Sequence, residues 1–190
     1  MHINFLYLLI IICSFWVISE VLLAILRRSK DGSRDFDKGS IKWLNAIIYI
    51  SITIAVSFGF SGIGKIRVGI SVIPWVGLFF ITAGLLIRWA AILTLRKYFT
   101  TNVAIHSGQK IIRTGLYRCV RHPSYTGSIM SFCGMGLALS NYISFVILVI
   151  PITIAFLMRI RIEEQAMVSA FGEEYENYRK KTWYLFPWIY

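Results

Sequence analysis

The sequence has few acidic residues: 9 Asp and Glu stand against 20 Lys and Arg, which gives a formal net charge of +11. Basic proteins often bind nucleic acids, but here the basic residues gather at the ends of apolar runs and form no aromatic RNA-binding module. Basic loops that flank apolar segments are typical of the cytoplasmic side of membrane proteins, where they suit anionic lipid head groups. We therefore expect membrane lipids as partners and no nucleic acid.

Cysteine and histidine are equally scarce, with three residues of each. Cys13, Cys119 and Cys133 lack metal-clip spacing and are odd in number, so we interpret them as free thiols. The histidines lie far apart in the sequence, and no metal site is predicted. A cleavable signal pattern is also missing, because no basic segment precedes the apolar run that begins at Ile3. That run is expected to stay as a membrane helix.

What the sequence does have is long apolar runs, and 57% of its residues are hydrophobic. A helix that spans a membrane needs about 20 mostly apolar residues. The runs predict five spans, at residues 3–26, 41–60, 71–95, 124–139 and 142–158. Only Ser140 and Asn141 separate the last two, which indicates a tight antiparallel helical hairpin.

These spans predict an all-α, polytopic membrane protein, because helices satisfy their own backbone hydrogen bonds in lipid. The 190 residues suit a single membrane domain. Residues 1–95 would supply three spans. Residues 96–190 would supply a long connection, the helical hairpin and a tail with a C-terminal helix.

The basic residues predict the orientation of the chain. Most of them lie in the segments 27–42 and 96–121 and after residue 158, whereas the second loop has only Lys65 and Arg67. The positive-inside rule therefore places the N-terminus outside and the C-terminal tail in the cytoplasm. The small size and the lack of a retention signal favour a prokaryotic plasma membrane.

Two segments on the predicted cytoplasmic side carry candidate chemistry. Pro123 suits the first position of the fourth helix, which holds Arg121 and His122 at a helix start with Tyr125 close behind. Helix starts favour carboxylates, so the carboxylate of a cofactor or substrate would fit there.

The second segment, the tail, begins with Glu163 and Glu164. These carboxylates either pair with Arg159 or Arg161, or bind a cationic cofactor or its ribose hydroxyls.

Two charged residues lie within predicted spans. Arg88, in the third span, either snorkels to the cytoplasmic surface or contacts substrate. Glu20, in the first span, is expected to pair with a nearby Lys or Arg.

Two blocks of the sequence resemble a known family. The block GLYRCVRHPSYTG at 115–127 is similar to the signature of the isoprenylcysteine carboxyl methyltransferase family. So is the second block, which consists of Glu163-Glu164, FGEEYENY at 171–178 and Phe186-Pro187. The likeness covers residues 96–187, about half of the chain, and the wider group includes phospholipid N-methyltransferases.

The resemblance implies an S-adenosylmethionine-dependent enzyme with its cofactor pocket on the cytoplasmic side. His122 and Tyr125 would contact the cofactor from the first block, and one or both of Glu163 and Glu164 from the second. The full set of implied cofactor-binding residues is Gly115, Leu116, Tyr117, Arg121, His122, Pro123, Tyr125, Glu163 and Glu164.

The sequence departs from the family pattern near its end. Many relatives carry Thr-x-Arg-x-x-Pro, and Tyr184 stands here at the Arg position, between Thr182 and Pro187. That Arg is expected to steer a substrate carboxylate. Arg88, Arg159 or Arg179 would have to substitute for it, or the nucleophile is an amine or a thiol. Arg88, Arg159 and Tyr184 are therefore the candidates for substrate positioning, and we assign no catalytic base.

The sequence thus predicts a membrane methyltransferase that acts on a lipophilic substrate, an isoprenylcysteine-type carboxyl or a similar small molecule. Whether O, N or S accepts the methyl group stays open, as does the oligomeric state. A phospholipid or amine N-methyltransferase is the alternative enzyme, and a small transporter or assembly factor is the alternative of another class. A transporter should show broken helices or internal repeats, and Pro151 is the one such feature of the sequence.

Overall fold

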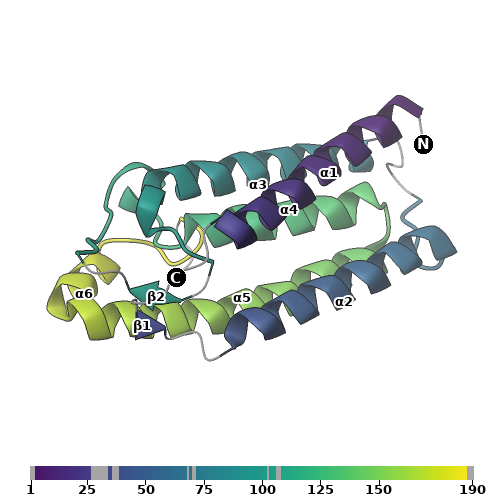
Figure 1. The fold of residues 1–190 in the computed structure, drawn as a ribbon. Helices are drawn as coiled ribbons and strands as arrows, with labels where there is room; N and C mark the ends of the chain where they lie inside the picture. Colours follow the sequence, from purple (N-terminus) through teal and green to yellow (C-terminus); the bar gives the residue numbers. More distant parts are fainter. Residues whose placement is uncertain are drawn as a thin grey trace.

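The computed structural model describes residues 3–26, 34–35, 39–67, 69, 72–101, 103–105 and 108–187. Five helices lie side by side along one axis (Figure 1). They are α1 (Ile3–Leu26), α2 (Ser40–Ser61), α3 (Ile73–Leu95), α4 (Pro123–Ala138) and α5 (Tyr142–Phe171).

Shorter elements gather at one end of this bundle. They are the 3-10 turns η1 (Arg96–Tyr98) and η2 (Gly115–Arg118), the helix α6 (Glu173–Arg179), and the strands β1 (Arg34–Asp35) and β2 (Ala104–Ile105), which pair antiparallel.

The prediction of an all-α membrane protein is confirmed. The helices α1, α2, α3 and α5 are long and apolar enough to cross a membrane. The helix α4 has 16 residues and is shorter than the about 20 that a full span needs. Its short length agrees with the predicted range of 124–139. In Figure 1, α4 lies among longer helices.

One predicted boundary is wrong. The fifth helix does not end near Met158 but continues to Phe171, where Gly172 adopts a positive φ of 52°. Charged residues do not stop a helix once it leaves the bilayer, and no Gly or Pro occurs between 159 and 171. Glu163 and Glu164 consequently lie on α5 itself, in a rigid position.

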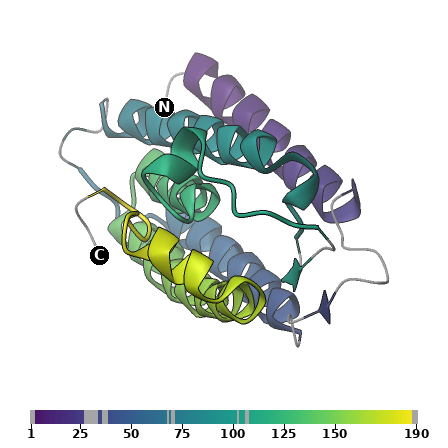
Figure 2. The ribbon, with the colours of Figure 1, turned by 90° about the vertical axis from the view of Figure 1, so that its left-hand side faces the viewer.

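The helices form two layers (Figure 1). One layer contains α1, α3 and α4, the other α2 and α5, and α4 also packs on α5 across the layers. Viewed from the end that carries α6, the connection after α3 runs across the space between the layers (Figure 2). The polar segments of residues 96–122 and 159–187 thus meet at one end of the bundle, as the predicted topology requires.

Glycines bring α3 and α4 into backbone contact. Gly77 lies against Gly134, and Gly84 against Gly127, so that a side chain at any of the four would collide with the opposite backbone. Small residues at helix interfaces are a common way to pack helices closely in membranes. This contact fixes the start of α4, where the candidate site residues lie, against α3.

The predicted hairpin between α4 and α5 is confirmed. Asn141 accepts a hydrogen bond from the Ser144 amide at 3.0 Å and donates to the carbonyls of Phe58 (3.0 Å) and Ile63 (2.6 Å). The Ser144 hydroxyl donates to the Ala55 carbonyl at 2.6 Å. The turn is therefore tied to the end of α2 as well as to α5.

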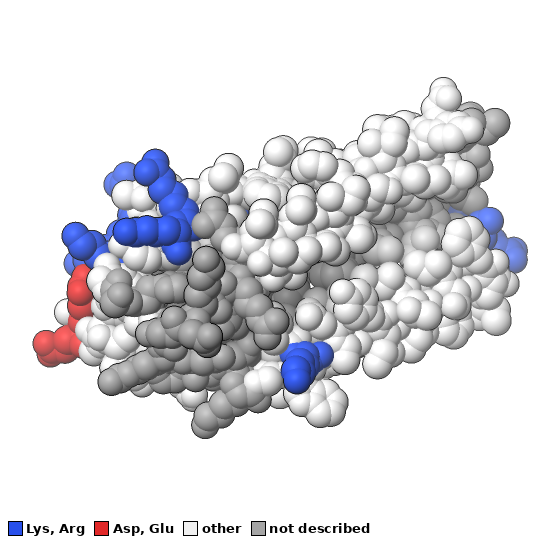
Figure 3. Space-filling model, in the orientation of Figure 1, with Lys and Arg blue, Asp and Glu red and all other residues white. Residues whose placement is uncertain are grey.

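On the face that Figure 3 shows, most charged side chains lie near the two ends of the molecule and some at the lower edge between them, and a broad uncharged area separates the ends. Large apolar side chains are exposed along α1, α2 and α3, Phe15, Ile50 and Phe79 among them. Such exposed apolar surface suits contact with lipid tails.

We expect Gly84→Leu to destabilise the protein, because the new side chain would meet the α4 backbone at Gly127 and Ser131. Overpacking of this kind costs about 1–3 kcal/mol or more. Ala90→Leu is the matched control, since Ala90 lies on the exposed side of the same helix. Thermal unfolding in detergent measures both variants, and equal melting temperatures would refute the close contact.

Candidate active site

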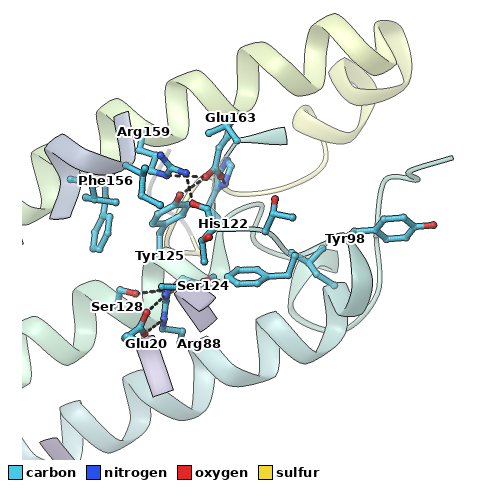
Figure 4. Close-up of a pocket in the computed structure, with 18 of the residues that line it drawn as sticks. Glu20, Arg88, Tyr98, His122, Ser124, Tyr125, Ser128, Phe156, Arg159 and Glu163 are labelled. Carbon is cyan, nitrogen blue, oxygen red and sulfur yellow. Dashed lines mark hydrogen bonds and ion pairs between the residues drawn. The ribbon is translucent and has the colours of Figure 1, made fainter. Parts of the chain in front are cut away.

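A cavity of about 540 Å³ opens between the two helical layers at the polar end of the bundle. One part of its wall is apolar, with Trp16, Leu44, Ile48, Phe132 and Phe156. The other part carries polar and charged side chains, most of which Figure 4 labels. These are Glu20, Arg88, Arg121, His122, Tyr125, Arg159 and Glu163. The cavity therefore joins a polar compartment to an apolar one.

The start of α4 holds His122 in place. His122 is the residue before the helix, Pro123 occupies its first turn, and the His122 carbonyl accepts the amides of Tyr125 and Thr126. The chain after α6 packs along this start: the Arg121 amide donates to the Trp183 carbonyl at 2.8 Å, and the Thr126 hydroxyl to the Leu185 carbonyl at 2.5 Å. The tail thus closes over the first block.

Arg121 and Glu164 form the buried link between the two sequence blocks. Arg121 Nε donates to Glu164 Oε1 at 2.9 Å, and its Nη1 donates to the carbonyls of Arg179 (2.9 Å) and Thr182 (2.5 Å). His122 Nε2 lies 3.2 Å from the same Glu164 oxygen. The Arg121 guanidinium also lies 5.3 Å from the centre of the Tyr184 ring.

Glu163 points the other way, into the cavity (Figure 4). It accepts a hydrogen bond from the Tyr125 hydroxyl, and Arg159 Nε lies 3.6 Å from the same carboxylate oxygen. Arg159 further donates to Ser40 Oγ at 2.7 Å and to the Thr101 carbonyl at 2.6 Å. Arg159 therefore ties α5 to the start of α2 and to the connection, and holds Glu163 between them.

Two tyrosines outside the spans support this arrangement. The Tyr178 hydroxyl, on α6, donates to the Tyr117 carbonyl at 2.7 Å. Burial raises the pKa of Tyr178 to about 12, and burial together with the nearby Glu163 carboxylate raises the pKa of Tyr117. Both hydroxyls stay protonated at neutral pH, and that of Tyr178 acts as a hydrogen-bond donor. The Tyr117 ring lines the cavity.

Arg88 and Glu20 form a bidentate ion pair on the cavity wall. Arg88 Nε lies 2.5 Å from Glu20 Oε1, and Nη2 lies 2.7 Å from Oε2. Arg88 Nη1 donates to the hydroxyls of Ser124 (3.0 Å) and Ser128 (2.9 Å) on α4. Arg88 thus reaches sideways to α1 and α4 rather than snorkelling, and the expected pairing of Glu20 is confirmed, with a partner on another helix.

The structure brings most of the predicted site residues together. Tyr117, Arg121, His122, Tyr125 and Glu163 line the cavity. Gly115, Leu116, Pro123 and Glu164 lie behind or beside it and are not among the residues of its wall. Of the three substrate-positioning candidates, Arg88 and Arg159 line the cavity, whereas Tyr184 packs against Arg121 and His122.

The sequence analysis missed other parts of the wall. Residues 98–101 of the connection and the inner face of α2, with Asn45 and Tyr49, also line the cavity. Their sequence pattern is that of an ordinary loop and an ordinary span. The Glu20–Arg88 pair could have been anticipated from the sequence, because two opposite charges occur within two predicted spans. His2, His106 and Trp188 lie outside the described residues.

We expect Arg121→Lys to lower the thermal stability of the protein, since a lysine cannot reach Glu164 and two carbonyls at once. Losing charge-assisted hydrogen bonds of this kind costs about 1.5–3 kcal/mol each. Arg118→Lys, at an exposed position of the same segment, is the control. Melting temperatures in detergent that drop equally for both variants would contradict the role of Arg121.

Comparison with known proteins adds to this geometry. Residues 75–169, half of the chain, match the profile of the isoprenylcysteine carboxyl methyltransferase (ICMT) family. A probable protein-S-isoprenylcysteine O-methyltransferase of Oryza sativa subsp. indica is 34% identical over 119 residues, which is 62% of each chain. The corresponding Schizosaccharomyces pombe enzyme is 34% identical over 54% of this chain and 44% of its own. Methanethiol S-methyltransferase 1 of Bradyrhizobium diazoefficiens is 33% identical over 38% of this chain and 25% of its own.

A solved structure of a eukaryotic intramembrane Ras methyltransferase, ICMT, superimposes with a TM-score of 0.60 and 25% sequence identity. The match covers 80% of this chain and 53% of that one. The chain therefore spans less than two thirds of the length of these relatives. The shared region nevertheless includes α3, α4 and most of α5, which carry the charged end of the cavity. This multi-pass integral membrane protein belongs to the isoprenylcysteine carboxyl methyltransferase family.

Proposed function

We propose that this protein is an S-adenosylmethionine-dependent methyltransferase that acts on a lipophilic acceptor within the membrane. The observation that carries this proposal is the convergence of His122, Tyr125 and Glu163 at the polar end of a cavity whose other end is apolar. These three residues come from the two blocks that resemble the family. One cavity thus offers room for a charged methyl donor and for an apolar acceptor.

The polar end suits S-adenosylmethionine, which supplies a methyl group on a positively charged sulfonium. The Glu163 carboxylate favours a cation or ribose hydroxyls nearby, and the Tyr117 and Tyr125 rings favour a cation by their π faces. His122 adds a hydrogen-bonding nitrogen at the start of α4, where the helix dipole favours a carboxylate. The residues present therefore fit this donor.

The protein's contribution would be to hold the two reactants and to exclude water. Arg159 contacts Glu163, the start of α2 at Ser40 and the connection at Thr101, and Arg121 holds the tail over the start of α4. Rigid positioning of two reactants can supply about 7–11 kcal/mol of a reaction barrier. Positioning is thus the contribution that these residues would make, and we assign no catalytic base.

The acceptor would enter from the bilayer. Facing side chains of α1 and α2 line the apolar part of the cavity, among them Val17, Val21, Ile48 and Ile52. An apolar tail can rest there while its head group reaches the polar end. The donor, which is charged, would enter from the aqueous side where the connection and the tail lie.

We expect Glu163→Gln and Tyr125→Phe to weaken binding of S-adenosylmethionine about 10–100-fold, the equivalent of one charge-assisted hydrogen bond. Glu173→Gln, at an exposed position of α6, should bind normally. Glu164→Gln should instead lower thermal stability, because it breaks the link to Arg121. Calorimetry on detergent-purified protein measures donor binding. A well-folded wild type that fails to bind the donor would refute the proposed function.

We further propose that the end with α6 faces the cytoplasm, as the distribution of Lys and Arg favours. In a background without cysteines, Lys65→Cys should react with a membrane-impermeant maleimide on intact cells. Lys180→Cys should react only after the membrane is opened, and both positions are exposed in the structure. The reverse labelling pattern would overturn this orientation.

A further inference from the structure

The cavity wall holds a charge arrangement that the methyl donor does not require. Glu20 on α1 and Arg88 on α3 pair beside the apolar part of the cavity, next to Ser124 and Ser128. The side chain of Glu20 is 35% exposed and that of Arg88 only 14%. Of the two charges, the carboxylate is therefore the one presented to an incoming head group.

Most N–H donors of Arg88 already form hydrogen bonds with other side chains of the protein. A guanidinium has five N–H donors, and four hydrogen bonds from Arg88 go to Glu20, Ser124 and Ser128. The fork formed by Nε and Nη2, which a substrate carboxylate would need, is occupied by the carboxylate of Glu20. A second carboxylate at this place would have to displace Glu20 or lie against it.

The other two guanidinium groups of the cavity wall are engaged as well. Arg121 donates to Glu164 and to two carbonyls, and Arg159 donates to Ser40 and Thr101. Tyr184 stands where many relatives carry an Arg. Lys110 also lines the cavity, from an exposed position where solvent and salt screen its charge.

Glu20 itself has acceptor capacity left. A carboxylate offers about four lone-pair sites. Arg88 uses one site on each oxygen of Glu20. N–H groups of an amine are the natural partners for the remaining sites, whereas a carboxylate would be repelled.

We propose that Glu20 selects the methyl acceptor: an apolar molecule with an amine head group is bound, and one with a free carboxylate is excluded. Transfer would form an N–CH3 bond as the S–CH3 bond of the donor breaks, and the amine would release one proton to water. This inference rests on the proposed function, because it concerns the acceptor of that reaction. It assigns Glu20 to acceptor recognition and Arg88 to holding Glu20 in place.

Three probes with one tail test the proposal. S-farnesylcysteamine carries an amine, N-acetyl-S-farnesylcysteine carries a carboxylate, and N-acetyl-S-farnesylcysteamine carries neither. Wild type should bind the amine about tenfold more tightly than the carboxylate, with the uncharged probe between them. Calorimetry in a single detergent measures all three. When the affinity of one probe is compared between variants, the effect of its partition into micelles cancels.

Glu20→Gln should reverse the order of the two charged probes, because Arg88 then has a free charge. The double variant Glu20→Gln with Arg88→Gln should lose this gain, which would show that Arg88 carries it. Arg88→Gln alone should strengthen binding of the amine. This variant also provides a second test if Glu20→Gln folds poorly.

Tighter binding of the carboxylate by wild type, an unchanged order of the probes in Glu20→Gln, or amine binding that Arg88→Gln does not strengthen would overturn the proposal. Binding of S-adenosylmethionine, measured in parallel, tests the proposed function separately and should stay within about twofold in Glu20→Gln. Competition by phosphatidylethanolamine in mixed micelles would identify the amine as that of a phospholipid head group. If the probe order holds without such competition, the amine belongs to a lipophilic molecule without phosphate.

Discussion

The buried ion pair between Arg121 and Glu164 is the contact on which the candidate site depends. It joins two segments that are 43 residues apart and draws the tail over the start of α4 through the carbonyls of Arg179 and Thr182. Successive residues on a helix point about 100° apart. Because Glu164 is turned toward Arg121, its neighbour Glu163 faces the cavity and meets Tyr125. Two adjacent carboxylates thus have different tasks, one in holding the fold together and one at the cavity wall.

The membrane sets the second constraint. Charged groups inside a span are costly unless they are paired or reach water. Arg88 and Glu20 satisfy this condition by pairing across two helices, and the serines of α4 take up further donors of Arg88. Removing one partner would cost more free energy than the pair contributes to stability, since the removal leaves an uncompensated charge in a poorly hydrated place. Such a pair is therefore expected to persist in the resting protein, with its more exposed carboxylate facing the cavity.

Much of this structure could be predicted from the sequence, and the exceptions have physical causes. The apolar runs predicted the long helices, because length and hydrophobicity decide which segments span a membrane. The short separation at Ser140-Asn141 predicted the hairpin. The length of α5 was missed because a helix that leaves the bilayer no longer has an apolar pattern to mark it. The convergence of His122, Tyr125 and Glu163 followed from two sequence blocks. The different orientations of Glu163 and Glu164 did not, because they depend on tertiary contacts of Arg121 and Arg159 that the sequence does not encode locally.

The family profile matches only part of the cavity wall, and this division bears on how one fold can serve different acceptors. The matched segment, residues 75–169, contains His122, Tyr125 and Glu163. Glu20 lies outside this segment, on α1, and α1 and α2 form much of the apolar wall. The relatives of this chain include a probable protein-S-isoprenylcysteine O-methyltransferase and a methanethiol S-methyltransferase, whose methyl acceptors differ in chemistry. A family that keeps the donor end and varies the helices around the acceptor end can change the chemistry of the acceptor without rebuilding the site for the donor. On our proposal, Glu20 is such a change, because one carboxylate on a peripheral helix occupies Arg88 and reverses the charge that the acceptor meets.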